Sequence, residues 1–207
     1  MGLVEGQKFL AQIYTNQEVR ASFFVDPQGV GKEFGLSVEE VNNLAQLSVQ
    51  QVNFFASYLR NKRLNEVCKL LPLTYKVLGK VFIQLFGIYA QNYVPKGIKK
   101  HRNDAIAFSH FIEQVASSEK IEPLWVLDLL RYETIWLKVA DPSCRWQIFW
   151  FRHSIKDLAK SVKINPEKAI LLRQTTLAVW FRFSKERQLR HIILSLPPLS
   201  IDTNYLK

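Results

Sequence analysis

The chain lacks the residues and signals that mark most metal-binding, redox or secreted proteins. Its 207 residues include only two cysteines, Cys68 and Cys144, whose separation fits neither a metal-binding nor a redox spacing. The first ten residues lack the cationic and apolar regions of a signal peptide. Gly2 lacks the Ser or Thr at position 6 that marks a myristoylation site. The apolar runs are shorter than the roughly 20 residues that span a bilayer, so the sequence predicts a cytoplasmic protein.

Catalytic and metal-binding patterns are missing as well. The histidines are His101, His110, His153 and His191. Their spacing fits no metal site, and no Ser, Cys or Thr stands in a recognisable nucleophile context. Two acid pairs, Glu39 with Glu40 and Asp128 with Glu133, lie in predicted helices, where solvated helix faces explain them. The sequence therefore predicts no catalysis by this chain alone, no cofactor and no metal.

Low-complexity tracts, Gly/Ser linkers and internal repeats are also absent. With 48% hydrophobic residues, the chain can bury a core as one domain or two small ones. Its net charge of +10 is uneven. Arg145–Arg190 holds 11 basic and 3 acidic residues, a net +8. Such a stretch attracts nucleic acid, anionic lipid or an acidic protein, although a basic surface can also serve only solubility.

The first half of the sequence predicts one short helix after another. Asn16, Asp26, Ser37 and Ser48 each stand where a helix N-cap is expected. A long helix is predicted from Ser48 to the residue before Pro72. The strongest helical pattern runs over 73–90, where two glycines, Gly79 and Gly87, permit close approach of another helix. Another helix is predicted over 99–116.

The last third changes character after a polar break at 117–120. A helix over 123–140 is apolar nearly all round, which indicates burial. Three segments rich in aromatic and β-branched residues, 145–152, 175–183 and 189–196, predict strands, with a helix over 155–162 and a hairpin loop over 184–188. In the first strand Trp146, Ile148 and Trp150 lie on one face and Phe149 and Phe151 on the other. We interpret this strand as buried on both faces, against an alternative in which its aromatic residues stack on single-stranded nucleic acid.

These patterns predict an α+β protein that is predominantly α-helical. The expected domains are an N-terminal multi-helix bundle over 1–118 and a smaller domain over 119–207 with a short antiparallel sheet. Nine residues are candidate contacts for an anion or a partner: Lys96, Lys99, Lys100, His101, Arg102, Arg145, Arg152, Arg182 and Arg190. The first five precede or begin a helix, where free N–H groups favour a carboxylate or phosphate. Simple solvation of these side chains explains the cluster equally well.

Several stretches resemble one family of bacterial proteins. FLAQIYTNQEVRASFFVDPQGVGKEFGLSVEEV resembles the pattern F-L-x-x-L-Y-T-D-x-x-x-R-x-x-F-x-x-D-P. The segments KRLNEVCKLLPLTYKVLGKVFIQLFGIYA, PKGIKKHRNDAIAFSHFI, DLLRYETIWLKVADPS and FRHSIKDL resemble later parts of the same proteins. This family consists of helical companions of multinuclear non-haem iron enzymes that modify peptides, as in methanobactin biosynthesis. Some relatives carry only a DNA-binding label. The N-terminal stretch also resembles the small helical subunit of ring-cleavage dioxygenases.

The resemblance implies a protein without chemistry of its own that binds the iron enzyme and helps to present a precursor peptide. We therefore expect a non-catalytic partner or peptide-presenting subunit. A second hypothesis is a regulator that binds nucleic acid through the same basic surface. A third is an enzyme whose residues meet only in the fold. It predicts a pocket that joins some of His101, His153, His191, Asp104 and Asp128.

Overall fold

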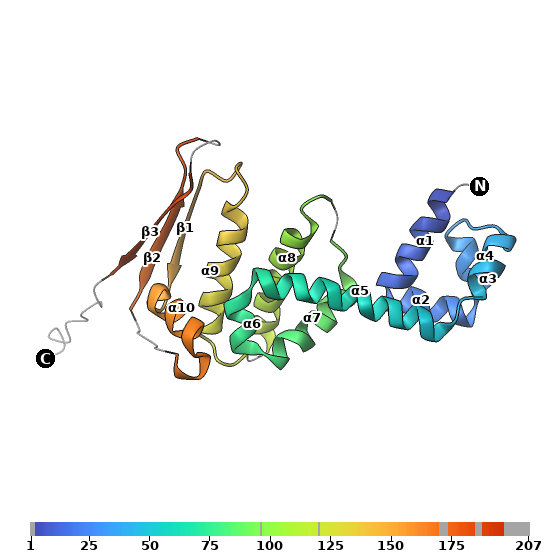
Figure 1. The fold of residues 1–207 in the computed structure, drawn as a ribbon, viewed down its shortest axis with the longest axis horizontal. Helices are drawn as coiled ribbons and strands as arrows, with labels where there is room; N and C mark the ends of the chain where they lie inside the picture. The colour runs from blue at the N-terminus through green and yellow to red at the C-terminus, as the bar shows by residue number, and fades with distance from the viewer. Residues whose placement is uncertain (1–2, 96, 120, 170–173, 185–187, 197–207) are drawn as a thin grey trace, which may run out of the picture. The chain divides into compact units, whose positions relative to one another are not determined.

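A computed structural model describes residues 3–95, 97–119, 121–169, 174–184 and 188–196 of the chain. Within these residues the protein is predominantly helical, with a small antiparallel sheet toward its C-terminal end (Figure 1). The predicted α+β class is confirmed. None of the helices in these ranges is both long enough and apolar enough to cross a membrane.

The helices follow one another closely along the first two thirds of the chain. The α-helices of the described residues are α1 (Leu3–Thr15), α2 (Gln17–Val25), α3 (Pro27–Glu33), α4 (Val38–Ala45), α5 (Val49–Leu70), α6 (Pro72–Leu78), α7 (Lys80–Asn92), α8 (Lys100–Ser118), α9 (Val126–Val139) and α10 (Ile155–Ile164). A short 3-10 helix, η1 (Pro166–Lys168), and the strands β1 (Trp146–Phe151), β2 (Thr176–Phe181) and β3 (Arg190–Ser195) follow. The three predicted strands are thus confirmed within two residues at each end. The predicted hairpin loop falls partly on 185–187, outside the described residues.

The mutual contacts of its residues divide the chain into two compact units that are not continuous in sequence. The first unit consists of Met1–Val67 and Ile83–Asp104, and the second of Cys68–Phe82 and Ala105–Lys207. This division differs from the expected boundary after residue 118, because α6 and most of α8 belong with the sheet. Whether 1–118 and 119–207 fold independently stays a prediction.

Side-chain caps set the boundaries of the first helices, as the sequence predicts. The Asn16 side chain accepts hydrogen bonds from the backbone N–H groups of Glu18 and Val19 at the start of α2. Ser37 and Glu40 form a capping box at the start of α4. A cap gives partners to amide groups that the helix leaves free, and each is worth about 1 kcal/mol. The core that these helices enclose is Phe9, Ile13, Phe23, Leu36, Val41 and Val52.

The predicted helix over 73–90 is wrong as one element, because it breaks at Gly79. Gly79 has a φ of 51°, a left-handed conformation that side chains other than glycine rarely adopt, and it ends α6. Helix α7 begins at the next residue, and Gly87 remains inside it. A Cβ added at either glycine would meet no heavy atom within 4 Å. Close approach of another helix is therefore not the reason for either glycine.

A buried ion pair joins α5 to the N-terminal part of α8 in the first unit. The Nε and Nη2 atoms of Arg63 donate to the two carboxylate oxygens of Asp104 at 3.0 and 2.8 Å. The Tyr89 hydroxyl donates to Asp104 Oδ1 at 2.8 Å, and Arg63 Nη2 also donates to the carbonyl of Tyr93. For an aspartate near the start of a helix, such as Asp104, a local role at that helix end is common. Its carboxylate instead forms a tertiary ion pair and is fully buried.

The sheet of the second unit has the order β1-β2-β3, and both of its ladders are antiparallel. Helices α9 and α10 lie against one of its faces (Figure 1). Phe151, Ala178 and Trp180 from the strands are buried there. They share one core with residues of the two helices: Leu129, Ile135, Val139, Ile155, Leu158 and Val162. The alternation of side chains along each strand sends the neighbouring residues to the opposite face.

Candidate functional site

The face of the sheet away from α9 and α10 is almost entirely apolar and exposed. We define the outer sheet face as Trp146, Ile148, Trp150, Leu177, Val179, Phe181, Arg190, Ile192 and Leu194, which the strand registers place side by side. Trp146 is 68% exposed and Trp150 is 57% exposed. On the other edge strand, Ile192 is 45% exposed and Leu194 is 50% exposed. Contiguous exposed apolar surface of this kind marks interaction sites in folded proteins.

This exposure corrects the interpretation of β1 as a strand buried on both faces. The alternation itself is confirmed, because Phe151 is buried while Trp146, Ile148 and Trp150 are exposed. The second face remains open because α9 and α10 cover only the inner face and no other described element lies over the outer one. The sequence pattern shows that both faces are apolar. It does not show whether this chain or another molecule covers them.

Cations lie around the outer sheet face, and three of the four predicted in this region are exposed. Arg190 stands on the face itself, opposite Phe181, and its guanidinium lies over the ring of Phe183 at 5.8 Å. Arg145 precedes β1 and Arg152 follows it, and both are exposed. Arg182 is different, because its Nη2 donates to the carbonyl of Val139 at 2.6 Å, at the end of α9. That guanidinium is therefore part of the packing between sheet and helix.

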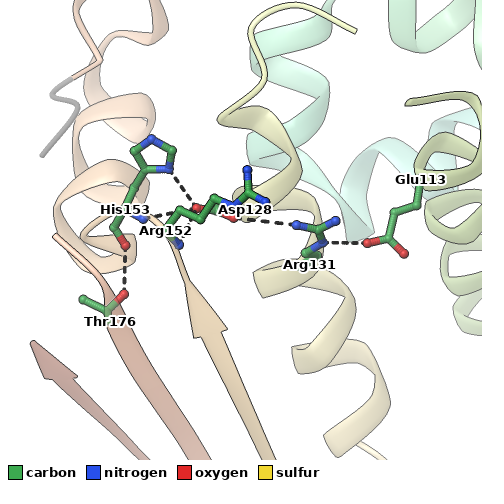
Figure 2. Close-up of polar contacts among 6 residues, drawn as sticks. All are labelled: Glu113, Asp128, Arg131, Arg152, His153 and Thr176. Carbon is green, nitrogen blue, oxygen red and sulfur yellow. Dashed lines mark hydrogen bonds and ion pairs between the residues drawn. The ribbon is translucent and has the colours of Figure 1, made fainter. Parts of the chain in front are cut away.

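A buried carboxylate fixes the turn that follows β1 (Figure 2). Asp128 Oδ2 accepts hydrogen bonds from the backbone N–H groups of Arg152 at 3.1 Å and His153 at 3.2 Å. It also lies 2.8 Å from His153 Nδ1, which therefore carries the hydrogen of that bond. The Thr176 hydroxyl donates to the carbonyl of His153 at 2.8 Å. These contacts hold the backbone at Arg152, so they set where that cation leaves the end of β1.

Asp128 and Glu133 are not on solvated helix faces, and that interpretation is corrected. Both carboxylates are buried, at 3% and 7% exposure. Asp128 holds the turn after β1, and Glu133 bonds to the start of α6 through Leu73 and Thr74. A sequence signal was present, because the segment over 123–140 is apolar nearly all round and leaves no solvated face for a carboxylate. Arg131 extends the Asp128 cluster toward α8, where its Nε donates to Glu113 at 2.7 Å.

The structure brings together one pair of the residues named in the enzyme hypothesis. His153 and Asp128 are hydrogen-bonded, while His191 lies in the aromatic cluster described below. Asp128 also accepts two backbone N–H groups, and the Thr176 hydroxyl meets a carbonyl rather than the imidazole. The His153–Asp128 pair therefore stabilises the turn that follows β1. Within the described ranges, no three His, Cys, Asp or Glu side chains lie where they could hold a metal ion together.

The predicted cationic cluster near the start of α8 is only partly described. Lys99 and Lys100 are exposed, whereas His101 and Arg102 are half-buried. Lys96 lies outside the described residues. These positions are compatible both with an anion seat and with simple solvation, so the two alternatives for this cluster stay open.

His191 lies among aromatic rings on the inner side of the sheet. Its ring stacks on Trp180 at 4.6 Å and meets Trp136 edge-on at 5.0 Å, with Tyr132 at 5.9 Å. Its Nε2 atom is buried and has no hydrogen-bond partner among the described residues. This burial lowers the pKa of the imidazole from its usual 6.5, because a charged ring is poorly solvated there.

We expect His191 to make the protein less stable in mild acid. The unfolded chain takes up the proton first, so the stabilisation by neutral His191 is complete above pH 6.5 and is lost as the pH falls below that value. The measurement is urea unfolding of the wild type and His191→Phe between pH 5 and pH 8. The wild type should lose stability relative to the variant below pH 6.5. An unchanged difference across this range would contradict the role of His191, and His110→Gln, at an exposed histidine, is the control.

Comparison with known proteins adds no family to these observations. No protein-family model matches the chain, and no curated protein matches it either. The resemblance to companions of iron enzymes therefore stays a prediction from the sequence. What the structure contributes is the outer sheet face, with its apolar centre and cations at its margins.

Proposed function

We propose that this chain is a non-catalytic, cytoplasmic partner protein that binds another protein through the outer sheet face. The observation that supports this most is the exposure of Trp146 and Trp150 beside Ile192 and Leu194 on one continuous face. From the sequence resemblance we further propose that the partner is a multinuclear iron enzyme that modifies a peptide. The chain would then help to hold the precursor peptide for that enzyme.

The chemistry of the outer sheet face favours a protein over a nucleic acid. Ile148, Val179 and Ile192 are aliphatic and occupy its middle row, where they offer no ring for base stacking and no charge for phosphates. Proteins that bind single strands combine a cationic groove with aromatic platforms. Protein interfaces instead have an apolar centre, in which Trp is a frequent hot spot, and a polar rim. Arg152 and Arg190 suit such a rim and favour an acidic margin on the partner.

Removal of the two tryptophans of the outer sheet face should abolish partner binding without unfolding the chain. A hot-spot Trp contributes about 2 kcal/mol or more, so the double variant Trp146→Ser with Trp150→Ser should weaken the complex by roughly a thousandfold. The test is capture with the tagged protein from its native lysate, washed at high salt, followed by identification and stoichiometry of the recovered protein. Phe54→Ser is the matched control, since Phe54 is 76% exposed on α5, outside the sheet.

The outcomes separate the two functions that the sequence allows. A stoichiometric protein recovered by the wild type and the control, but not by the double variant, supports the partner role. If that protein is an iron enzyme, the second part of the proposal is supported as well. Nucleic acid retained only at low salt, equally by the wild type and the tryptophan variant, would favour the nucleic-acid-binding regulator. In that case, affinity should fall with salt with a log–log slope of about −0.9 for each phosphate contacted.

A further inference from the structure

A second feature lies in the first unit, where helices α1, α2, α5 and α7 line a hollow of about 470 Å³, open solvent included. Three arginines line it: Arg20 from α2 and Arg60 and Arg63 from α5. Its neutral polar lining residues are Tyr14, Thr15, Gln17, Ser57 and Gln91. All of its lining residues are described, and none of them is acidic. The acidic residue Glu18 lines an adjoining hollow that shares Gln17 and Gln91.

The charges of the three arginines are not balanced within this hollow. Arg63 has its own counter-ion, because it is bonded to both oxygens of Asp104. The Nη1 atom of Arg20 donates to the carbonyl of Ile13 at 2.8 Å, which positions the guanidinium but does not neutralise it. Arg60 is exposed. Among the described residues neither Arg20 nor Arg60 forms an ion pair with a carboxylate. Two positive charges therefore remain without a counter-ion from the part of the chain that the structure describes.

The guanidinium groups of Arg20 and Arg60 repel each other electrostatically. Burial lowers the pKa of Arg20, and the charge of Arg60 lowers it further. A fold that holds two like charges at one hollow accepts an electrostatic cost, which an anion bound between them removes. Guanidinium groups donate in a planar fork that matches the oxygens of a phosphate. The side chains of Gln17, Ser57 and Tyr14 supply neutral donors beside them.

We propose that this hollow binds a small phosphate-bearing dianion, either inorganic phosphate or a phosphate monoester, between Arg20 and Arg60. Phosphate carries a charge of about −1.5 to −2 at neutral pH, which balances the two free cations. The hollow is open to solvent, so an organic substituent on the phosphate can extend out of it past Gln91, which can donate to that substituent. This inference does not depend on the outer sheet face, because every residue of the hollow belongs to the first unit.

The test is a titration of the full chain with inorganic phosphate and, separately, with glycerol 3-phosphate. Ionic strength is kept constant with chloride, and binding is followed by calorimetry and by the NMR signals of the arginine Nε–H groups. Arg60→Gln removes one charge at an exposed position, so it should fold normally and weaken binding by about tenfold or more. Lys62→Gln also removes an exposed charge from α5, but outside the hollow, and should bind like the wild type.

A second variant tests the fork geometry. Arg20→Lys keeps the charge but loses the planar pair of donors, so it should also bind less tightly than the wild type. Equal affinity for the two probes identifies inorganic phosphate as sufficient, and tighter binding of glycerol 3-phosphate identifies a monoester. The proposal is overturned if Arg60→Gln and Lys62→Gln bind alike, if chloride alone reproduces the shifts, or if neither probe binds saturably.

Discussion

Replacement of Asp104 by alanine should lower the free energy of unfolding by about 3–5 kcal/mol, as expected when one partner of a buried ion pair is removed. The Asp104 carboxylate has a relative exposure of 1%, and that of the Arg63 side chain is 16%. Without Asp104 the guanidinium of Arg63 would keep only the carbonyl of Tyr93 as an acceptor. The Tyr89 hydroxyl would lose its carboxylate acceptor and keep the backbone carbonyl at position 104, 3.1 Å away. Urea unfolding of wild type and variant at neutral pH measures the loss.

Two further variants show whether charge burial is the cause. Tyr89→Phe removes one hydrogen bond to Asp104 and should cost about 1 kcal/mol. The double variant Arg63→Met with Asp104→Leu replaces the pair by apolar groups and should be more stable than Asp104→Ala, because no charge is left unpaired. A loss below about 1 kcal/mol for Asp104→Ala would show that the pair behaves like an exposed salt bridge, against its buried geometry. Burial and the nearby Asp104 charge also raise the pKa of Tyr89 above its usual range, so its hydroxyl stays a donor.

Local sequence signals predict the elements of this protein better than the partners of its polar residues. Asn16 and Ser37 cap helices because a cap and the amides it serves lie within a few residues of each other. Asp104 lies near the start of a helix, but its partner Arg63 lies 41 residues earlier in the chain. Spacing along one helix carries no information about such a pair. Only the packing of the first unit brings them together.

The outer sheet face likewise shows that local sequence patterns do not reveal which elements pack together. Alternation in β1 correctly assigns Trp146 and Trp150 to one face, since it depends only on the pleat of a strand. The expectation that both faces are buried required knowledge of how many elements cover the sheet. The break at Gly79 is a similar case, because a glycine inside an apolar helical pattern is compatible with a helix or with its end. The hollow at Arg20 and Arg60 leaves no motif at all, because its residues come from four separate helices.

Replacement of Glu133 by alanine should cost about 3 kcal/mol or more. Helix α6 begins at Pro72 without a side-chain cap from its own N-cap residue. Glu133, on α9, provides that cap. Its Oε1 accepts from the backbone N–H of Leu73 at 2.7 Å, and its Oε2 accepts from the N–H and hydroxyl of Thr74 at 3.0 and 2.7 Å. Alanine leaves these donors without an acceptor, and a buried unsatisfied donor costs about 1–3 kcal/mol. Urea unfolding near pH 5 measures this loss, and Glu119→Ala, at an exposed glutamate, should change stability by less than about 0.5 kcal/mol.

Glu133 should also make stability fall as the pH rises, and this separates it from His191. Burial raises its pKa from 4.5 to about 7, although the hydrogen bonds from Thr74 and Leu73 lower it. The unfolded chain ionises first, so the stabilisation by protonated Glu133 is complete below pH 4.5 and is lost between pH 4.5 and about 7. This rise in the pKa of Glu133 corresponds to a loss of about 3 kcal/mol in the free energy of unfolding across this pH range. Glu133→Gln cannot ionise, so the wild type should lose stability relative to it over this range.

The two effects oppose each other between pH 4.5 and 6.5, because His191 destabilises the fold as the pH falls and Glu133 destabilises it as the pH rises. A shallow pH dependence in the wild type would therefore not mean that neither group titrates. In Glu133→Gln, where only His191 titrates, the free energy of unfolding should fall as the pH is lowered. In His191→Phe, where only Glu133 titrates, it should fall as the pH is raised toward neutral. In the double variant, the free energy of unfolding should show neither of these two changes with pH. If Glu133→Gln keeps the slope of the wild type, Glu133 is ionised throughout, and its hydrogen bonds to α6 outweigh the cost of burying its charge.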